Sequence, residues 1–414
     1  MRFTGLKYLQ LLACLGLFAC GSAERYDVVI VGGGASGTAA GLQAARMGAR
    51  TLIVEEFDWL GGMLTSAGVS ATDGNYRLRG GIWDEFRTEL ARHYGCDSAL
   101  ITGWVSNVMF EPSVGDSIFK RLVAREPNLT VWYRSAAETA ERGKDVWRLG
   151  VRRDGRLRQV EAGVLVDATE LGDVARMAGV PYDVGMDSSA VTHEDIAPAE
   201  ANGIVQDLTY VAVLKDYGRD VTIPRPDGYD PSLFACCCVN DLCIAPKEPH
   251  RMWSREMMIT YGKLPDGKYM INWPIEGNDY YVDMIDMTPE ERADAVRRAK
   301  NHTLSFVYFL QHELGFNTLG LADDEFPTED RLPFIPYHRE SRRIHGAVRF
   351  TPVSYTHLTL PTTLPTPTQE RFTVRRSAWA IIRSISTIPA IRAGTNCPTS
   401  ISIPSPRTVF RWAS

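Results

Sequence analysis

The chain has 414 residues, of which 23% are charged and 44% hydrophobic, and its formal net charge is −5 at pH 7. A mildly negative chain without a general basic surface is not expected to bind nucleic acid. Eight cysteines are too few for a disulfide-built scaffold of this length. The length allows two compact domains, each with its own hydrophobic core.

The first 20 residues are typical of an export signal. A basic start with Arg2 and Lys7 precedes an apolar run that ends at Cys20 and is too short for a stable helix across a bilayer. Residues 17–20 resemble a bacterial lipobox, in which Cys20 becomes the lipidated first residue. We expect an exported protein, periplasmic or a lipoprotein of the outer membrane or cell surface, that touches the membrane only through this lipid. A plain secretory peptide with an incidental Cys20 is the alternative.

Residues 24–180 are predicted to form the first domain, which opens with a strand, a glycine-rich loop, a helix and a second strand. The strands are predicted at 26–31 and 50–56 and the helix at 36–47. This order predicts parallel strands joined by a right-handed crossover. Further patterns predict helices at 80–94 and 112–125, strands at 129–133, 145–151, 158–161 and 163–168, and a turn at 153–155.

Residues 181–325 differ in character, with longer loops and more Pro, Asp and Tyr. We interpret them as a substrate domain inserted into the first domain, which returns at 326–353. A helix is predicted at 289–314, because the acidic residues of its first turn favour the positive end of a helix dipole.

Residues 354–414 contain one acidic residue, Glu370, and neither Asp nor Lys. They show no helical or strand periodicity. One interpretation is a disordered tail rich in Ser, Thr and Pro. The other, which we favour, is a frameshifted, non-native segment, because residues 353–363 resemble a translated sequencing adapter.

The glycine-rich loop at 32–37 reads G-x-G-x-x-G directly after a strand. Gly32 allows the sharp turn out of the strand, and Gly37 allows the helix to pack closely on the sheet. Gly34 lets a diphosphate approach the amino end of the helix, where free N–H groups and the dipole favour an anion. Ala35 and Ser36 complete this predicted diphosphate-binding loop.

An acidic residue, Glu55, closes the second strand about twenty residues after the loop, where such motifs place a ribose-binding acid. Its neighbour Glu56 takes that role if the strand ends one residue later. The loop and the acid together predict an adenine dinucleotide, and at this point either NAD or FAD fits.

Four stretches taken together resemble the FAD-dependent oxidoreductase family of exported bacterial flavoproteins, some of which carry a xanthan lyase label. They are the unit at 26–56, LGGMLTSAG at 60–68, LVDATELGDVARMAG at 165–179 and RESRRIHG at 339–346. The resemblance covers residues 25–350. It implies an α/β fold like that of glutathione reductase: a parallel-sheet Rossmann-type FAD-binding domain with a β-meander and an inserted substrate domain.

The resemblance also implies further cofactor-binding residues, on the turn after the second strand and at a later strand end: Gly61, Gly62, Met63, Asp167, Ala168, Thr169, Gly172 and Asp173. At position 170 the chain departs from this resemblance, because most relatives have Gly where it has Glu170. Helix capping by Thr169 or Asp173 is the structural alternative for this region.

The stretch at 339–346 supplies candidate catalytic residues. Arg339 or Arg342 could hold a polar substrate near the flavin or stabilise negative charge on the reduced ring, and bridging between domains is the alternative. His338 is the candidate base. Residues 271–281 contain Trp273 and Tyr280, which either line a sugar-like substrate or belong to the core.

We therefore expect an FAD-dependent oxidoreductase that moves a hydride from an unidentified, carbohydrate-related small molecule to flavin and passes the electrons to an unknown acceptor. An NAD-dependent Rossmann enzyme and a truncated, inactive flavoprotein are the alternatives, the latter because the final flavin segment is lost at about residue 353. The cysteines at 235–243 lack C-x-x-C, so we predict no metal centre and expect a disulfide that involves Cys243.

Overall fold

The computed structural model describes residues 23–74, 76–247 and 249–347. The export signal with Cys20, and the whole of residues 354–414, lie outside the described residues, so both interpretations stay predictions. Within the described residues, no helix has the length and apolar character that crossing a membrane requires.

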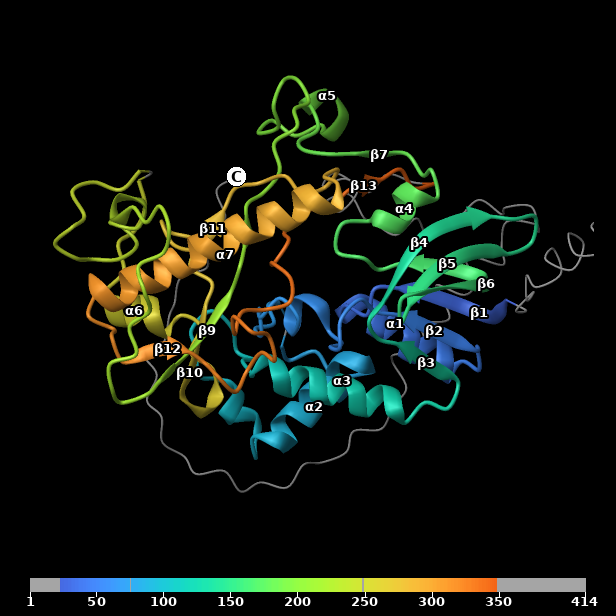
Figure 1. The fold of residues 1–414 in the computed structure, drawn as a ribbon, viewed down its shortest axis with the longest axis horizontal. Helices are drawn as coiled ribbons and strands as arrows, with labels where there is room; N and C mark the ends of the chain where they lie inside the picture. The colour runs from blue at the N-terminus through green and yellow to red at the C-terminus, as the bar shows by residue number, and fades with distance from the viewer. Residues whose placement is uncertain (1–22, 75, 248, 348–414) are drawn as a thin grey trace, which may run out of the picture.

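The first part of the chain forms a six-stranded sheet, coloured blue to green in Figure 1, with the strand order β3-β2-β1-β6-β5-β4. Neighbours pair in parallel from β3 to β6, and the β6–β5 and β5–β4 pairs are antiparallel. The strands are β1 (Glu24–Val31), β2 (Thr51–Val54), β3 (Leu129–Trp132), β4 (Ser135–Arg142), β5 (Trp147–Arg153) and β6 (Arg156–Asp167). The predicted Rossmann-type sheet with a β-meander is confirmed.

Two details of this sheet differ from the prediction. The strands predicted at 158–161 and 163–168 are one strand, β6, because Gly163 does not break it but lies where β1 approaches closely: a Cβ there would stand 3.0 Å from the Asp27 carbonyl oxygen. β4 was not predicted, since its sequence SAAETAER is mostly exposed and rich in Ala and Glu, which are rare in strands.

Helices cover one face of the sheet. They are α1 (Ala35–Arg46), α2 (Gly81–His93) and α3 (Pro112–Ala124). Leu42 of α1, Phe86 of α2 and Phe119 of α3 are buried in one cluster. The other face of the parallel strands is covered by β5 of the meander and by α4 (Asp173–Met177), since Val174 of α4 and Leu149 of β5 are buried with Val29 of β1. The carboxyl ends of β1, β2 and β6 are thereby left facing the rest of the chain.

The second part of the chain forms a three-stranded antiparallel sheet with the order β10-β9-β12, packed against a 24-residue helix, α7. Figure 1 shows α7 running above this sheet. Thr288 and Glu291 form a capping box at the start of α7, which explains why the helix begins where its acidic residues predicted. The elements are β9 (Ala212–Asp216), β10 (Lys268–Ile271), β12 (Leu319–Leu321), α6 (Arg255–Thr260) and α7 (Pro289–His312).

Short pairs connect the segments. β7 (Tyr182–Asp183) pairs with β13 (Arg343–Ile344), and β8 (Leu208–Thr209) pairs with β11 (Asp279–Tyr280). The remaining short helices are α5 (Ser189–Thr192), η1 (Gly62–Leu64), η2 (Asp97–Leu100), η3 (Pro231–Leu233) and η4 (Pro265–Gly267). The domain boundaries at residues 180, 325 and 353 stay predictions.

Candidate functional site

A cleft of about 340 Å³ lies at the carboxyl ends of β1, β2 and β6. Its volume falls within the range of small-molecule sites, about 300–1,000 Å³. Of the residues predicted from the sequence, the cleft is lined by Gly32, Gly34, Glu55, Glu56, Gly62, Ala168, Thr169, Asp173 and His338. The strand ends of a parallel sheet are where such folds bind ligands, so the structure brings these residues together at the expected place.

Two of the three motif glycines are required by the backbone itself. Gly32 has a φ of +98°, and a Cβ there would lie 2.2 Å from the Ala168 carbonyl oxygen. A Cβ on Gly37 would lie 2.0 Å from the Gly32 carbonyl oxygen. Gly37 does not line the cleft, so its role is the close packing of α1 on the sheet.

Gly34 is different, because a Cβ there would meet no close contact. Its Cβ would have only ordinary contacts, 3.6 Å from Oε1 of Glu170 and 3.9 Å from the Ala168 carbonyl oxygen. Gly34 also precedes the first residue of α1 and offers no side chain to cap it. The first-turn N–H groups, which include those of Ala35 and Ser36, are therefore left to a ligand, and an anion suits them best.

A second glycine turn lies directly against the first. The N–H of Gly61 donates to the Gly33 carbonyl oxygen over 2.8 Å. Gly61 and Gly62 have φ values of +110° and +52°, and a Cβ on Gly62 would stand 2.8 Å from the Gly34 Cα. Met63 follows but packs half-buried into the hydrophobic core and does not line the cleft. Two turns without side chains thus form adjacent walls, which suits a bulky anion.

Glu55 lies at the end of β2 with both carboxylate oxygens engaged. Oε2 accepts a hydrogen bond from the Gly33 N–H over 2.6 Å, and Oε1 accepts one from the Phe57 N–H over 2.9 Å. Burial raises its pKa to about 7, although these hydrogen bonds favour the charged form. Each oxygen can accept a second hydrogen bond, so a ribose hydroxyl can still be held. Glu56 is exposed and also lines the cleft.

The end of β6 serves mainly as a helix cap. Oδ2 of Asp167 accepts a hydrogen bond from the Ala175 N–H over 2.7 Å, and Oγ1 of Thr169 accepts one from the Asp173 N–H over 2.9 Å. The capping alternative therefore fits Thr169 and extends to Asp167. Gly172 has a φ of +72° at the amino end of α4 and, like Asp167, does not line the cleft.

Asp173 makes a bidentate ion pair with Arg292 of α7. Nη1 to Oδ2 is 2.7 Å and Nη2 to Oδ1 is 2.8 Å. Burial alone would raise the pKa of Asp173, but hydrogen bonds from Arg292 and Arg342 hold it below its usual value. Arg292 also lines the cleft, and no sequence pattern singled it out, since it reads as one of several charged residues on an amphipathic helix.

The three candidate catalytic residues have different surroundings. His338 is half-buried in the cleft wall, and burial, together with nearby Arg292, lowers its pKa to about 4. Arg339 binds the Asp207 carbonyl oxygen and Asp279, and Arg342 binds Asp173 and Asp286. Neither arginine lines the cleft. Both arginines instead make contacts between segments, as the alternative interpretation of bridging between domains expects. Their catalytic assignment stays a prediction.

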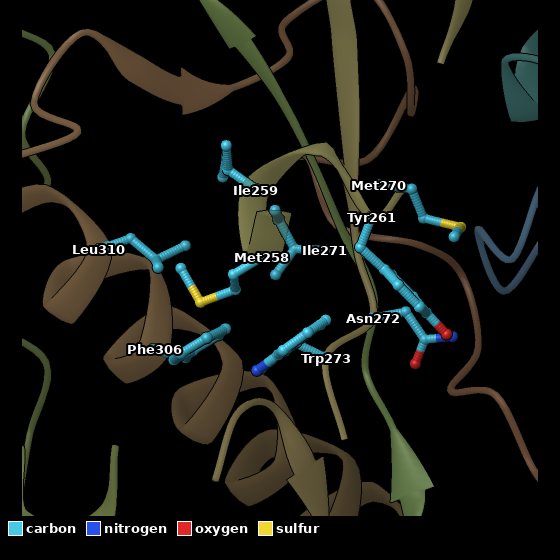
Figure 2. Close-up of a pocket in the computed structure, with 9 residues that line it drawn as sticks. All are labelled: Met258, Ile259, Tyr261, Met270, Ile271, Asn272, Trp273, Phe306 and Leu310. Atoms are coloured by element: carbon cyan, nitrogen blue, oxygen red, sulfur yellow. The ribbon is translucent and has the colours of Figure 1, made fainter. Parts of the chain in front are cut away.

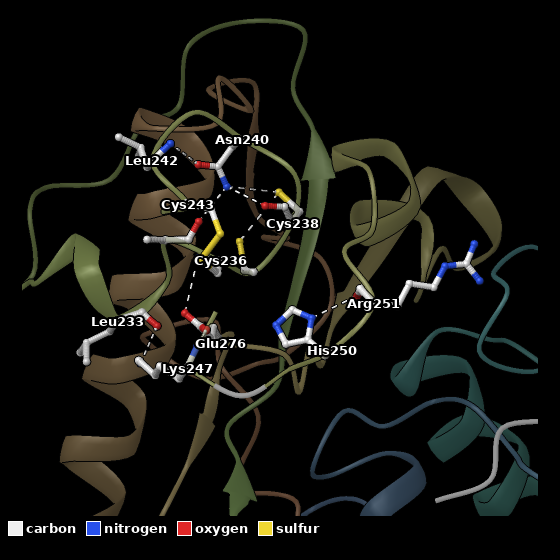
Figure 3. Close-up of a disulfide and its surroundings, with 12 residues drawn as sticks. Leu233, Cys236, Cys238, Asn240, Leu242, Cys243, Lys247, His250, Arg251 and Glu276 are labelled. Carbon is white, nitrogen blue, oxygen red and sulfur yellow. Dashed lines mark hydrogen bonds between the residues drawn. A yellow bond between two sulfur atoms is a disulfide. The ribbon is translucent and has the colours of Figure 1, made fainter. Parts of the chain in front are cut away.

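The cysteine-rich loop contains the expected disulfide, between Cys236 and Cys243 (Figure 3). Cys237 and Cys238 are buried free thiols. Across the part of the chain that the structure describes, no group of three or more His, Cys, Asp or Glu is arranged to hold a metal ion.

The structure places Trp273 in the hydrophobic core rather than at a sugar-binding surface. It is 3% exposed and donates from its indole N–H to the Cys237 carbonyl oxygen. Figure 2 shows it among apolar side chains of α6, β10 and α7, around a pocket of about 10 Å³. That volume has room for about one water molecule, so the pocket cannot hold a sugar.

Comparison with known proteins gives one family and several distant structures. Residues 27–363 match the family described as FAD dependent oxidoreductase. No curated protein matches the chain. Among solved structures, p-nitrophenol 4-monooxygenase PnpA from Pseudomonas putida is 13% identical, with a TM-score of 0.32 over 68% of this chain and 62% of that one. L-proline dehydrogenase from P. horikoshii is 18% identical, with a TM-score of 0.23 over 41% and 26%.

The amino acid oxidase NikD is 14% identical, with a TM-score of 0.27 over 47% of this chain and 59% of that one. The chain thus spans between 26% and 62% of the length of these three structures, and the likenesses are too loose to support an argument. The family match stands on its own, because it covers most of the chain and agrees with the glycine turns and the sheet. The chain belongs to the FAD-dependent oxidoreductase family and binds FAD.

Proposed function

We propose that the chain oxidises a small polar molecule, a carbohydrate or a derivative of one, with FAD held across the cleft at the ends of β1, β2 and β6. The observation that carries the cofactor's placement is that a Cβ on Gly34, beside Gly62 at the uncapped amino end of α1, would meet no close contact. When bound, FAD supplies the redox chemistry by accepting a hydride from the substrate and passing the electrons to a second acceptor.

The residues that hold the cofactor are mostly backbone groups. The first-turn N–H groups of α1 bind the diphosphate, and Gly34 and Gly62 leave room for it. Glu55 accepts the ribose hydroxyls. Ser135 donates its N–H to the Glu55 carbonyl oxygen over 2.9 Å, which places the next two residues, Ala136 and Ala137, beside Glu55 in the lining of the same cleft. Because their side chains are small, they provide a surface for the adenine.

His338 acts as a neutral hydrogen-bonding group of the cleft. With its pKa lowered to about 4, its ring is uncharged at pH 7. One ring nitrogen can then accept a hydrogen bond or a proton, but a group with so low a pKa is a weak base. Its charged neighbours are Asp173 and Arg292, which pair with each other in the wall of the cleft that α4 and α7 form.

The carbohydrate assignment draws on a feature outside the cleft. Export, predicted from the first 20 residues, would bring the protein to extracellular carbohydrates.

The first experiment identifies the nucleotide. We expect the purified 414-residue chain to be yellow and to release FAD on denaturation, and the stripped protein to quench added flavin fluorescence as it rebinds FAD. Release of NAD would support the nicotinamide alternative. A colourless protein that leaves flavin fluorescence unchanged would overturn the assignment. Oxidation of sugars and sugar acids with an artificial electron acceptor would then test the substrate class.

A further inference from the structure

The carboxylate of Glu170 lies between the two glycine turns. Its Oε1 is 3.6 Å from the point where a Cβ of Gly34 would stand, and 2.7 Å from the corresponding point on Gly62. Glu170 lines the cleft and follows the end of β6 by three residues. A charged side chain therefore reaches into the space that the two glycine turns leave open.

No positively charged side chain of the described residues pairs with the Glu170 carboxylate. Among residues 23–347, positions 75 and 248 aside, no hydrogen bond or ion pair to Glu170 is seen, and burial raises its pKa. The other titratable groups of the cleft are three acids, Glu55, Glu56 and Asp173, and two basic residues, Arg292 and His338. Arg292 is bound to Asp173, and His338 is neutral at pH 7, so neither offers Glu170 a free positive charge.

We propose that Glu170 limits the affinity of this chain for the diphosphate of FAD, because its carboxylate occupies the place that the diphosphate takes. The inference rests on the placement of FAD proposed above. Two anions cannot share the space in front of Gly34, since like charges a few ångström apart repel strongly in a half-buried site. FAD therefore binds only when the Glu170 side chain turns away or is neutral.

The side chain has a reason to occupy this place in the absence of FAD. The amino end of α1 is positive, and a carboxylate near it gains the same interaction that the diphosphate gains. Glu170 thus competes with the ligand for the helix end. This competition predicts an effect on every ligand that carries the diphosphate and none on a ligand that lacks it.

The test compares apo-protein of the full chain with the variants Glu170→Gln and Glu170→Gly. Binding of FAD, ADP and adenosine is measured by calorimetry, with flavin fluorescence as a second readout for FAD. We expect both variants to bind FAD and ADP at least about tenfold more tightly than the wild type, which is about 1.4 kcal/mol, and adenosine equally. Glu161→Gln is the matched control, because it removes the same charge from β6, where Glu161 pairs with Arg148 at the surface.

A second readout needs no ligand. Burial of an unpaired carboxylate destabilises the folded protein, whereas the positive end of α1 stabilises it, so Glu170→Gln should change the free energy of unfolding by no more than about 1 kcal/mol. A larger loss of stability would show that the charge has a structural partner in the folded protein, and would overturn the proposal.

The binding outcomes separate the two levels of the argument. If FAD and ADP bind the variants as they bind the wild type, or more weakly, Glu170 does not compete and the proposal fails while the FAD site stands. If adenosine tightens as much as ADP, the effect does not act on the diphosphate and the proposal also fails. If FAD and ADP bind none of the proteins, the proposed placement of FAD fails and the role of Glu170 fails with it.

Discussion

Arg342 donates a hydrogen bond from Nη1 to Oδ1 of Asp173 over 2.7 Å, and its side chain is fully buried. Its second terminal nitrogen reaches the Ile285 carbonyl oxygen and, over 2.8 Å, the carboxylate of Asp286. One arginine therefore ties the start of α4 to the loop that precedes α7. Its terminal N–H donors are used in these contacts, which favours a bridging role over contact with a substrate.

The substitution Arg342→Gln tests that role. It leaves Asp173 and Asp286 short of a partner, and because both are part-exposed we expect the free energy of unfolding to fall by about 3 kcal/mol, at the low end for a buried pair. Arg297→Gln, an exposed change on α7, should alter it by no more than about 0.5 kcal/mol. Urea denaturation measures both. An Arg342→Gln protein of unchanged stability that loses turnover would restore the catalytic interpretation.

The glycine loop could be predicted from the sequence because its function depends on local backbone geometry. Gly32, Gly34 and Gly37 lie within six residues, and the strand before them and the helix after them are visible as patterns. The ribose acid follows at a fixed spacing for the same reason. The parallel sheet then follows from the handedness of the crossover.

The contacts that define the rest of the cleft are long-range, and no local pattern encodes them. Arg292 meets Asp173 across 119 positions and Arg342 meets Leu171 across 171. The sequence marked Glu170 only as a departure from a family pattern. That its carboxylate points at Gly34 and Gly62 depends on the packing of β6 against two loops, which only the structure shows.

The two motif glycines Gly34 and Gly37 should respond differently to alanine. A Cβ at Gly34 has no close contact, and the φ of −60° suits alanine, so Gly34→Ala should fold with its stability changed by about 1 kcal/mol or less. The added methyl group lies where the diphosphate approaches, so FAD affinity should fall at least about tenfold. Thermal melting and flavin fluorescence titration measure the two effects.

Gly37→Ala is the counterpart, because its Cβ would lie 2.0 Å from the Gly32 carbonyl oxygen. We expect it to lower the free energy of unfolding by about 3 kcal/mol, the upper end for overpacking. If Gly34→Ala binds FAD like the wild type, the diphosphate does not approach the helix at Gly34. Equal melting of the Gly37→Ala and wild-type proteins would contradict the packing role.

The cysteine loop gives a prediction about covalent structure. Cys236 and Cys243 are bonded across a separation of seven residues, whereas Cys237 and Cys238 are buried thiols. Alkylation of the unfolded, unreduced protein should label Cys237 and Cys238, and proteolysis should yield a peptide joined through Cys236 and Cys243. The double substitution of this pair by serine should reduce stability by about 2 kcal/mol, as expected for a short loop. Mass spectra that show Cys237 or Cys238 in a disulfide would contradict the assignment.

A buried acid at the start of α3 should make stability depend on pH. Glu111 is 3% exposed and accepts a hydrogen bond from the hydroxyl of Tyr94, and its own N–H donates to that hydroxyl over 3.1 Å. Burial raises its pKa from 4.5 to about 7, although Tyr94 and Lys268 favour the ionised form. The folded protein therefore holds the Glu111 proton more tightly than the unfolded chain does.

The sign of the effect follows from linkage. The stabilisation is fully present below about pH 4.5 and is lost as the pH rises through about 7. Glu111→Gln stays neutral and keeps an acceptor for Tyr94, so between pH 5 and pH 8 the variant should gain up to about 3 kcal/mol relative to the wild type. Urea denaturation of both proteins at several pH values measures how the stability difference between variant and wild type changes with pH. The effects of other titrating groups cancel, because both proteins contain them. A difference that does not change with pH would show that Glu111 remains ionised throughout, and that Lys268 and Tyr94 outweigh its burial.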